Sequence, residues 1–290
     1  MSFHPGQSLA DAVREATAVL ADAGVPSPRV DAELLADHLL GVGLGRLRAM
    51  LLGTTPAPEG YASLVAERAS RVPLQHITGV AYFRHLELHV GPGVFVPRPE
   101  TESVVQLVID RIASLDRPKV ADLGTGSGAI AGSIAHEVPG SEVHAVEFSH
   151  LAYAWAARNL EPLGVILVEG DLRDALVEHD GTFDAVVSNP PYIPAKAIPN
   201  EPEVALHDPP EALYGGGADG MELPTAAAAS AARLLKPGGY FVMEHAEVQA
   251  GWIAGMLGRA GKWQDITTHF DLNGKERATS AVLAKTATEE

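Results

Sequence analysis

The residues best suited to chemistry in this sequence are Ser188-Asn189-Pro190-Pro191-Tyr192, which directly follow the apolar run Ala185-Val186-Val187. Each proline fixes its own φ, supplies no backbone N–H and keeps the preceding residue out of the helical region. A strand must therefore end here, and a stiff loop must follow it. Ligands of open α/β sheets bind just beyond the carboxyl ends of the strands. We interpret this stretch as the place where the reaction occurs.

A glycine-rich loop earlier in the chain forms a second part of the predicted site. A short strand over residues 119–123 is followed at once by Gly124-Thr125-Gly126-Ser127-Gly128 and then by a helix over 129–136. This succession is typical of the first βα unit of a nucleotide-binding domain, in which glycines let the backbone approach a ligand closely. Glu147 ends the next strand, 23 positions after Gly124, where its carboxylate can accept hydrogen bonds from both ribose hydroxyls.

Three further residues are candidates for the site. Asp171 and Leu172 follow a third strand over 165–168, where the acid could bond an adenine amine and the leucine could pack on the adenine face. Arg98 lies between Pro97 and Pro99, which would hold its side chain on a stiff loop. We predict a substrate-binding role for Arg98.

Strands and helices that alternate along residues 97–290 must position these residues. Seven strands and five helices predict a doubly wound α/β sheet. The expected strands span 119–123, 143–147, 165–168, 182–187, 240–244, 264–270 and 277–284. Between the fourth and fifth strands, the Pro- and Gly-rich segment 193–219 is predicted to be a lid or substrate loop.

The chain in front of this domain has a different character. Helical periodicity over residues 8 to 73 predicts a small bundle at 1–73, which we expect to recognise a substrate or partner. Alternating apolar residues at 86–90 and the turn-forming residues Gly91-Pro92-Gly93 predict a β-hairpin connector at 74–96.

Composition excludes several classes of protein. The 290 residues are 46% hydrophobic, which indicates a globular chain. The chain has no cysteine, so disulfides and thiolate chemistry are excluded, and its 12 histidines form no ligand pattern, so no metal is expected. The first residues lack the layout of a signal peptide and no apolar run reaches about 18 residues, so we expect a cytoplasmic protein with no role at membranes.

The net charge of −16 is concentrated in the second part of the chain. Residues 1–90 carry 7 Lys and Arg against 9 Asp and Glu, whereas residues 91–290 carry 14 against 28. Because affinity for nucleic acid comes largely from basic side chains that neutralise phosphates, we expect no direct nucleic-acid binding and favour a protein partner.

The order of these motifs resembles a known group of enzymes. Over about residues 97–285, Asp122-x-Gly124-x-Gly126-x-Gly128, Glu147, Asp171 and Asn189-Pro190-Pro191-Tyr192 resemble the Rossmann-like, S-adenosylmethionine-dependent class I methyltransferases. The whole chain resembles the HemK/PrmC family of release factor glutamine methyltransferases. Three further segments carry this likeness: 75–79, 96–102 and Glu244-His245-Ala246-x-x-Gln249.

The resemblance implies a fold, a cofactor and a substrate. It implies a mostly parallel seven-stranded sheet whose last strand is antiparallel, S-adenosyl-L-methionine as methyl donor and S-adenosyl-L-homocysteine as product. The implied substrate is the glutamine of the Gly-Gly-Gln motif in class 1 peptide-chain release factors. Separately from the resemblance, we expect a monomer. Glu147 and Leu172 depart from the usual aspartate and the frequent aromatic residue of the family, which affects how the nucleoside is held.

The resemblance also assigns roles to residues. The donor would be held by Gly124, Thr125, Gly126, Ser127, Gly128, Glu147, Asp171, Leu172 and Asn189. Catalysis would rest on Asn189, Pro190 and Tyr192. The substrate would be bound by the same three residues together with Pro191 and Arg98.

Three other functions remain open at this level. An adenine amino-methyltransferase acting on DNA would use the same tetrad, but it would need a basic groove, which the acidic body does not favour. An NAD(P)-dependent dehydrogenase would need G-x-G-x-x-G, and here the third glycine comes one residue early. A non-catalytic binding module would have no use for an intact tetrad.

Overall fold

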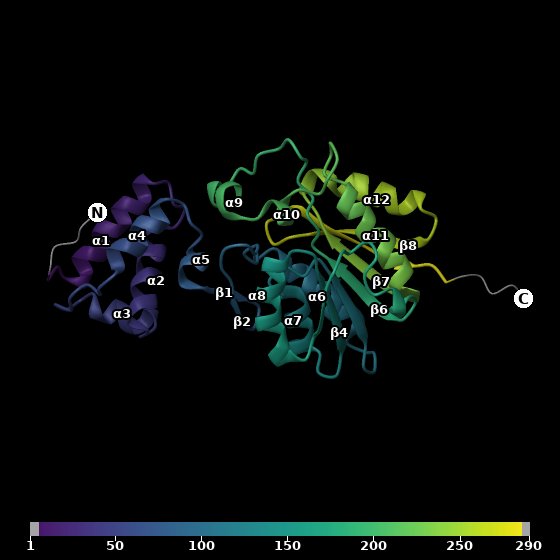
Figure 1. The fold of residues 1–290 in the computed structure, drawn as a ribbon, viewed down its shortest axis with the longest axis horizontal. Helices are drawn as coiled ribbons and strands as arrows, with labels where there is room; N and C mark the ends of the chain where they lie inside the picture. Colours follow the sequence, from purple (N-terminus) through teal and green to yellow (C-terminus); the bar gives the residue numbers. More distant parts are fainter. Residues whose placement is uncertain (1–5, 286–290) are drawn as a thin grey trace, which may run out of the picture. The chain divides into compact units, whose positions relative to one another are not determined.

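The computed structural model describes residues 6–285 and divides them into two compact units, which we treat separately (Figure 1). The helical unit comprises residues 6–80 and 199–207, and the sheet unit comprises residues 81–198 and 208–285. The boundaries at 73 and 96 that we drew from the sequence stay predictions.

The helical unit is a bundle with its own apolar core. Ser8 begins the first helix as expected, since its side chain accepts a hydrogen bond from the Asp11 backbone N–H. Leu9, Leu20, Leu35, Leu47 and Tyr61 lie fully or almost fully buried in the core. The helices of this unit are α1 (Leu9–Asp22), α2 (Pro28–Leu40), α3 (Leu44–Met50), α4 (Tyr61–Ala69), α5 (Leu74–Thr78) and α9 (Pro202–His207).

Helix α9 is held in the helical unit by partly buried ion pairs, although it comes from the segment that follows the tetrad. Glu203 accepts hydrogen bonds from the Arg68 guanidinium at 2.9 Å and from Arg71 at 2.9 and 2.5 Å. Arg68 also donates to Asp31 at 2.8 Å, and its side chain is only 6% exposed. Burial raises the pKa of Glu203, but the bonds from Arg71 and Arg68 outweigh this effect and hold the pKa below its usual range.

The predicted hairpin is present, but two of its details were wrong. Its strands are β1 (Val80–Phe83) and β2 (Leu86–His89), so the turn lies at Arg84-His85 and not at Gly91-Pro92-Gly93. The segment before it forms the short helix α5 rather than extended chain. Arg84 adopts a positive φ of 50°, which its bonds with Glu102 and Glu137 stabilise.

The seven-stranded sheet was predicted correctly. Its order is β5-β4-β3-β6-β7-β9-β8, with neighbours from β5 to β7 parallel and β9 antiparallel to both of its neighbours. The chain builds outward from β3 in one direction and then restarts at β6 in the other, so the switch point lies between β3 and β6. The strands are β3 (Lys119–Leu123), β4 (Glu142–Glu147), β5 (Ile166–Glu169), β6 (Phe183–Ser188), β7 (Leu235–Glu244), β8 (Trp263–Phe270) and β9 (Glu276–Leu283).

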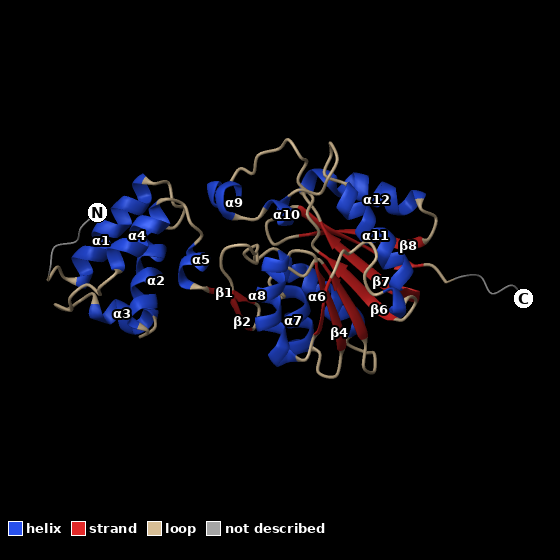
Figure 2. Ribbon diagram, in the orientation of Figure 1, coloured by secondary structure: helices blue, strands red, loops and turns tan. Residues whose placement is uncertain are grey.

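Helices cover both faces of this sheet (Figure 2). Helices α6 (Thr101–Ile112), α7 (Ala129–Glu137) and α8 (His150–Leu160) pack on one face, together with the apolar residues of the hairpin. Helices α11 (Glu222–Leu234) and α12 (Ala250–Arg259) pack on the other. The central strands read as continuous apolar runs because both of their faces are buried.

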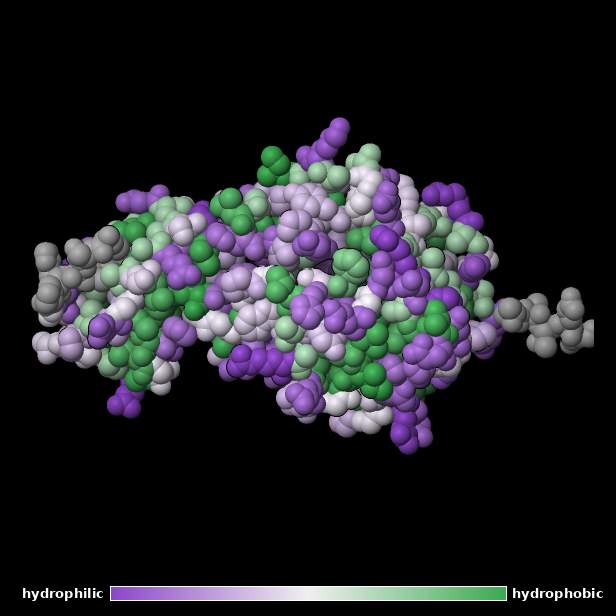
Figure 3. Space-filling model, in the orientation of Figure 1, coloured by the Kyte–Doolittle hydropathy of each residue, from purple (hydrophilic) through white to green (hydrophobic). Residues whose placement is uncertain are grey.

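Short elements fill the connections of the sheet unit. Helix α10 (Pro210–Leu213) lies in the predicted substrate loop, and three 3-10 turns complete the list: η1 (Glu161–Leu163), η2 (Val177–His179) and η3 (Glu247–Gln249). No helix within residues 6–285 is both long and apolar enough to cross a membrane. The face drawn in Figure 3 mixes hydrophilic and hydrophobic residues, with the apolar ones gathered in several separate places.

Candidate active site

The glycine loop leaves open space at the end of β3. Gly124 and Gly126 have φ values of +79° and +60°, in the left-handed region that side chains disfavour. A Cβ atom built on either residue would meet no heavy atom within 4 Å. The backbone is therefore bare on this side, as a ligand that lies directly on the loop would require.

Gly128 has a different reason to be glycine. Its Cβ would lie 2.7 Å from Leu160 Cγ, so the start of α7 packs directly against α8. The neighbouring Ser127 is 3% exposed, and its carbonyl accepts a 2.8 Å hydrogen bond from Asn159. These contacts fix the backbone of the loop, and the predicted contacts of both residues with the donor stay predictions.

Asp122, in β3, and Thr125, in the glycine loop, form a buried polar pair. The Thr125 hydroxyl donates to Asp122 Oδ2 at 2.6 Å, and the Ala131 N–H donates to the same oxygen at 3.2 Å. The other oxygen, Oδ1, is buried and has no hydrogen-bond partner in the described part of the chain. Burial raises the pKa of Asp122 to about 7. An orphaned buried acceptor two residues before the open loop suits a ligand that carries a hydrogen-bond donor or a positive charge.

Glu147 lies beside the glycine loop at the end of β4. Its Oε2 accepts the Gly126 N–H and its Oε1 accepts the Ser149 N–H, each at 2.8 Å. Each oxygen keeps a lone pair that can accept a hydroxyl hydrogen. Burial raises the pKa of this carboxyl group, although the backbone N–H bonds act in the opposite direction.

The end of β5 brings Asp171 and Leu172 to the same edge of the sheet. The register pairs Glu147 with Glu169, and the Gly170 N–H donates to the Glu147 carbonyl at 2.9 Å. Asp171 Oδ1 accepts the Arg173 N–H at 2.9 Å, whereas Leu172 is only 8% exposed and belongs to the core on the α11 side. The proposed contacts of both residues with adenine stay predictions.

The tetrad follows β6 on the other side of the switch point. Ser188 pairs with Leu123 in the register, and its hydroxyl donates to the Leu123 carbonyl at 2.6 Å. Asn189 and the glycine loop therefore begin at the same level of adjacent strands. Asn189 and Tyr192 are half-buried and Pro190 is buried. Burial raises the pKa of the Tyr192 phenol, which stays neutral at physiological pH.

Two glycines of the segment after the tetrad, Gly215 and Gly220, pack closely against the tetrad backbone. A Cβ on Gly215 would lie 2.6 Å from the Pro191 carbonyl oxygen, and one on Gly220 would lie 2.3 Å from the Tyr192 carbonyl oxygen. The Ile193 N–H donates to the Leu213 carbonyl at 2.8 Å. The backbone of the 213–220 segment thus touches the tetrad, which explains why the long loop is rich in glycine.

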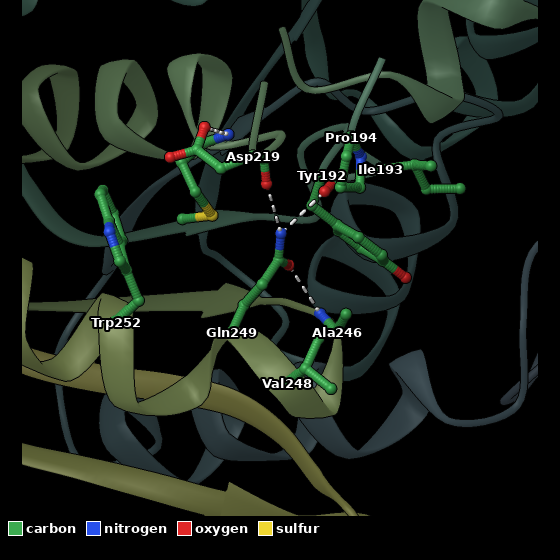
Figure 4. Close-up of a pocket in the computed structure, with 9 residues that line it drawn as sticks. Tyr192, Ile193, Pro194, Asp219, Ala246, Val248, Gln249 and Trp252 are labelled. Carbon is green, nitrogen blue, oxygen red and sulfur yellow. Dashed lines mark hydrogen bonds between the residues drawn. The ribbon is translucent and has the colours of Figure 1, made fainter. Parts of the chain in front are cut away.

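Gln249 locks the same region through its carboxamide (Figure 4). Its Nε2 donates to the Tyr192 carbonyl at 2.8 Å and reaches the Asp219 carbonyl at 3.4 Å, and its Oε1 accepts the Ala246 N–H at 3.1 Å. These residues line a mainly apolar cavity of about 380 Å³, which Trp252 bounds on one side. The sequence showed the Glu-His-Ala-x-x-Gln segment but gave no role to its glutamine.

Arg98 is held on its stiff loop, as its neighbouring prolines predict. Its guanidinium lies 3.4 Å from Asp208 Oδ2 and 5.1 Å from the centre of the Phe95 ring. Its charge acts on the Tyr192 phenol, so Arg98 and the tetrad lie in the same part of the sheet unit. A substrate contact by Arg98 stays a prediction.

Sequence reasoning missed two buried residues beside the tetrad. Thr101, the first residue of α6, is 4% exposed, and its hydroxyl lies 3.5 Å from the Asn189 amide nitrogen. Glu244, the last residue of β7, is 2% exposed. Both lie in segments that carry the family resemblance, but nothing in the sequence assigns either residue a role, because their closeness to Asn189 arises only from the fold.

The fold and the site together define a class I methyltransferase. A glycine loop, an acid at the next strand end and an Asn-Pro-Pro-Tyr loop surround the switch point of a sheet with one antiparallel strand. The hMettl16 catalytic domain, in complex with the MAT2A 3'UTR hairpin 6, has the same fold. Its TM-score is 0.55 at 12% identity, and the match covers 79% of this chain and 83% of that chain.

Sequence comparison identifies the family. The PrmC N-terminal domain family matches residues 11–79, and the methyltransferase small domain family matches residues 85–218. The release factor glutamine methyltransferase of Streptomyces coelicolor is 50% identical over 272 residues, which cover 93% of this chain and 96% of the relative. The chain belongs to the family of release factor glutamine methyltransferases.

A relative with a different name lies within the same range of similarity. The 4-amino-L-phenylalanine/4-methylamino-L-phenylalanine methyltransferase of Streptomyces pristinaespiralis is 40% identical over 273 residues, which cover 92% of each chain.

Proposed function

We propose that this protein transfers a methyl group from S-adenosyl-L-methionine to the side-chain amide nitrogen of the glutamine in the Gly-Gly-Gln motif of class 1 release factors. The observation that carries the proposal is the juxtaposition of the Asn189-Pro190-Pro191-Tyr192 loop and the open glycine loop across the β3–β6 switch point. Family membership supports the release factor as substrate. Because termination of translation is cytoplasmic, we place the reaction in the cytoplasm.

The residues at the ends of β3, β4 and β5 fit the methyl donor. Gly124 and Gly126 leave room for it, Glu147 has lone pairs for the ribose hydroxyls, and Asp122 has an unused acceptor for its ammonium group. We expect Asp171 and Leu172 to contact the adenine. When bound, S-adenosylmethionine supplies an electrophilic methyl group on a sulfonium and leaves as S-adenosylhomocysteine.

The tetrad addresses the poor nucleophilicity of an amide. The nitrogen lone pair of a carboxamide is delocalised into its carbonyl group, so attack requires this conjugation to be disturbed. The Asn189 side-chain oxygen and the Pro190 carbonyl can each accept one N–H, which favours a pyramidal nitrogen whose lone pair points at the methyl. Tyr192 can stack on the amide plane. As the N–C bond forms, the nitrogen loses one proton to solvent.

Positioning accounts for much of the rate in this mechanism. In-line placement of nitrogen and methyl lowers the entropic part of the barrier, and two fixed acceptors stabilise N–H bonds that strengthen in the transition state. We assign no general base to the reaction. Loss of one such acceptor commonly costs about 10²–10³ in rate.

The variant Asn189→Ala tests this assignment. We expect the affinity for S-adenosylmethionine to change by only a few-fold and the single-turnover rate to fall by about 10²–10³. Isothermal titration and rapid-quench assays with a release factor measure the two quantities. An unchanged single-turnover rate would remove Asn189 from the mechanism.

A labelling experiment tests the substrate. The protein is incubated with methyl-labelled S-adenosylmethionine and one of four additions: a class 1 release factor, the same factor with its Gly-Gly-Gln glutamine changed to alanine, DNA, or 4-amino-L-phenylalanine. We expect label on the unchanged factor alone. Label on DNA would favour the adenine methyltransferase, and label on the amino acid would place the chain with its Streptomyces pristinaespiralis relative.

A further inference from the structure

Glu244 stands directly beside Asn189 in the sheet. The parallel register pairs Ser188 of β6 with Met243 of β7, so the next residues along the two strands, Asn189 and Glu244, are neighbours at the carboxyl edge. Glu244 is 2% exposed, which is rare for a carboxyl group without a paired cation. Its Oε2 has no hydrogen-bond partner within residues 6–285. A buried acid with an unused oxygen next to the proposed catalytic amide calls for a functional explanation.

The residues around Asn189 favour one of the two orientations of its side-chain amide. A carboxamide has a donor end and an acceptor end, and hydrogen-bond partners decide which end points where. The Asn189 amide nitrogen faces the Thr101 hydroxyl at 3.5 Å, and both residues lie close enough to the Glu244 carboxyl group to lower its pKa. An ionised carboxylate can only accept hydrogen bonds, so it attracts the NH₂ end and repels the oxygen end.

We propose that Glu244, with Thr101, is a positioning residue that holds the Asn189 amide nitrogen toward the strand ends and thereby turns its oxygen toward the substrate amide. The proposal rests on the proposed function, because it gives the Asn189 oxygen the task of accepting a substrate N–H. Glu244 itself touches Asn189 and not the reacting atoms. Without it, both orientations of the Asn189 amide would be populated, and only one of them presents an acceptor.

The charge of Glu244 then matters for turnover. The pKa of Glu244 is raised to about 7, chiefly by burial. Of the groups around it, Thr101, Arg277 and Asn189 lower this pKa, and the negative charge of Glu100 raises it. The Tyr192 phenol also faces this group, and its own pKa is raised, so it stays neutral. When protonated, Glu244 gains an O–H that can donate to the Asn189 oxygen and favour the wrong orientation. We therefore expect kcat to rise with pH through about 7, as Glu244 ionises.

The test compares Glu244→Gln with Glu247→Gln, an exposed acid three residues further along that serves as a matched control. For Glu244→Gln we expect kcat to fall roughly 10- to 100-fold, as for loss of other groups that orient a catalytic ligand. KM for the release factor and the Kd of S-adenosylmethionine should stay within about threefold, because substrate and donor touch other residues. The rise of kcat near neutral pH should disappear in Glu244→Gln and persist in Glu247→Gln.

Several outcomes would overturn the inference. It fails if Glu244→Gln keeps the wild-type kcat, or if it loses activity but keeps the wild-type pH profile. If Glu244→Gln does not fold, Thr101→Val provides the test, because it removes the hydroxyl group that faces the Asn189 amide nitrogen. An unchanged kcat in Thr101→Val would refute the proposed role of Thr101 and Glu244. The proposed function fails separately, if the wild-type enzyme does not methylate the release factor at all.

Discussion

Gly126→Ala adds one methyl group at a point where the protein leaves room for it. Gly126 has a φ of +60°, and its Cβ would meet no heavy atom within 4 Å. The cost to the free protein is therefore the left-handed backbone of an alanine, about 1–2 kcal/mol. For a protein of this size, such a loss lowers the melting temperature by roughly 2–8 °C.

The cost to donor binding should be of a different kind. The added methyl occupies the space in which we place S-adenosylmethionine, and overpacking by one such group costs about 1–3 kcal/mol. This free energy corresponds to a Kd raised roughly 5- to 150-fold, since each 1.4 kcal/mol is a factor of about ten. Titration calorimetry with S-adenosylmethionine measures the change without requiring turnover.

Gly140→Ala separates strain from contact. Gly140 also has a positive φ, +88°, and also faces open space. It precedes the amino-terminal end of β4, however, whereas the glycine loop lies at the carboxyl ends of the strands. We expect this variant to lose similar stability and to bind the donor like the wild type. A wild-type Kd in Gly126→Ala would show that the open space does not receive the donor. Equal losses of affinity in both variants would show that strain alone is responsible.

Three further predictions follow from buried groups. Because burial raises the pKa of Asp122 to about 7, the folded state holds its proton more tightly than the unfolded state, and stability falls as pH rises from about 4 to 7. Asp122→Asn removes this effect and should melt above the wild type at pH 8 but not at pH 4; an equal or lower melting temperature at pH 8 contradicts the assignment. Glu203→Gln should cost the helical unit about 1–3 kcal/mol near neutral pH in chemical unfolding. Since the folded pKa of Glu203 is lowered, this difference should vanish in acid, and a difference that persists there would speak against the charge pairing. Gly220→Ala would place Cβ 2.3 Å from the Tyr192 carbonyl oxygen, so we expect turnover to drop well below that of Gly140→Ala, and wild-type turnover would show that this contact is unimportant.

The sequence predicted the sheet well because its central strands are buried on both faces. Runs such as Ala185-Val186-Val187 leave little choice of structure, and the glycines of the 124–128 loop mark positions where the backbone takes a positive φ. The Asn-Pro-Pro-Tyr loop is recognisable for the same reason, since two prolines dictate its local shape. Local chemistry and tertiary structure agree at these positions.

The failures occurred where tertiary contacts decide. The hairpin turns at Arg84-His85, a pair with no turn preference, because Arg84 bonds with Glu102 and Glu137 from other elements. Glu244 was read only as part of a strand end in a family segment, since its neighbour Asn189 is 55 residues away in the chain and adjacent only through the register of β6 and β7. Periodicity reports which face of an element is buried, but not which residue stands opposite.

Helix α9 has a consequence for how this protein can be divided or recombined. The chain leaves the helical unit after residue 80, returns for residues 199–207 and leaves again, so the two units share three crossings rather than one linker. A truncation that removes residues 6–80 would strip Glu203 of both its arginine partners while keeping the loop that carries it. A chimaera that takes the helical unit from a relative therefore also needs that relative's 199–207 segment. We expect residues 6–80 and 199–207 to change together among relatives.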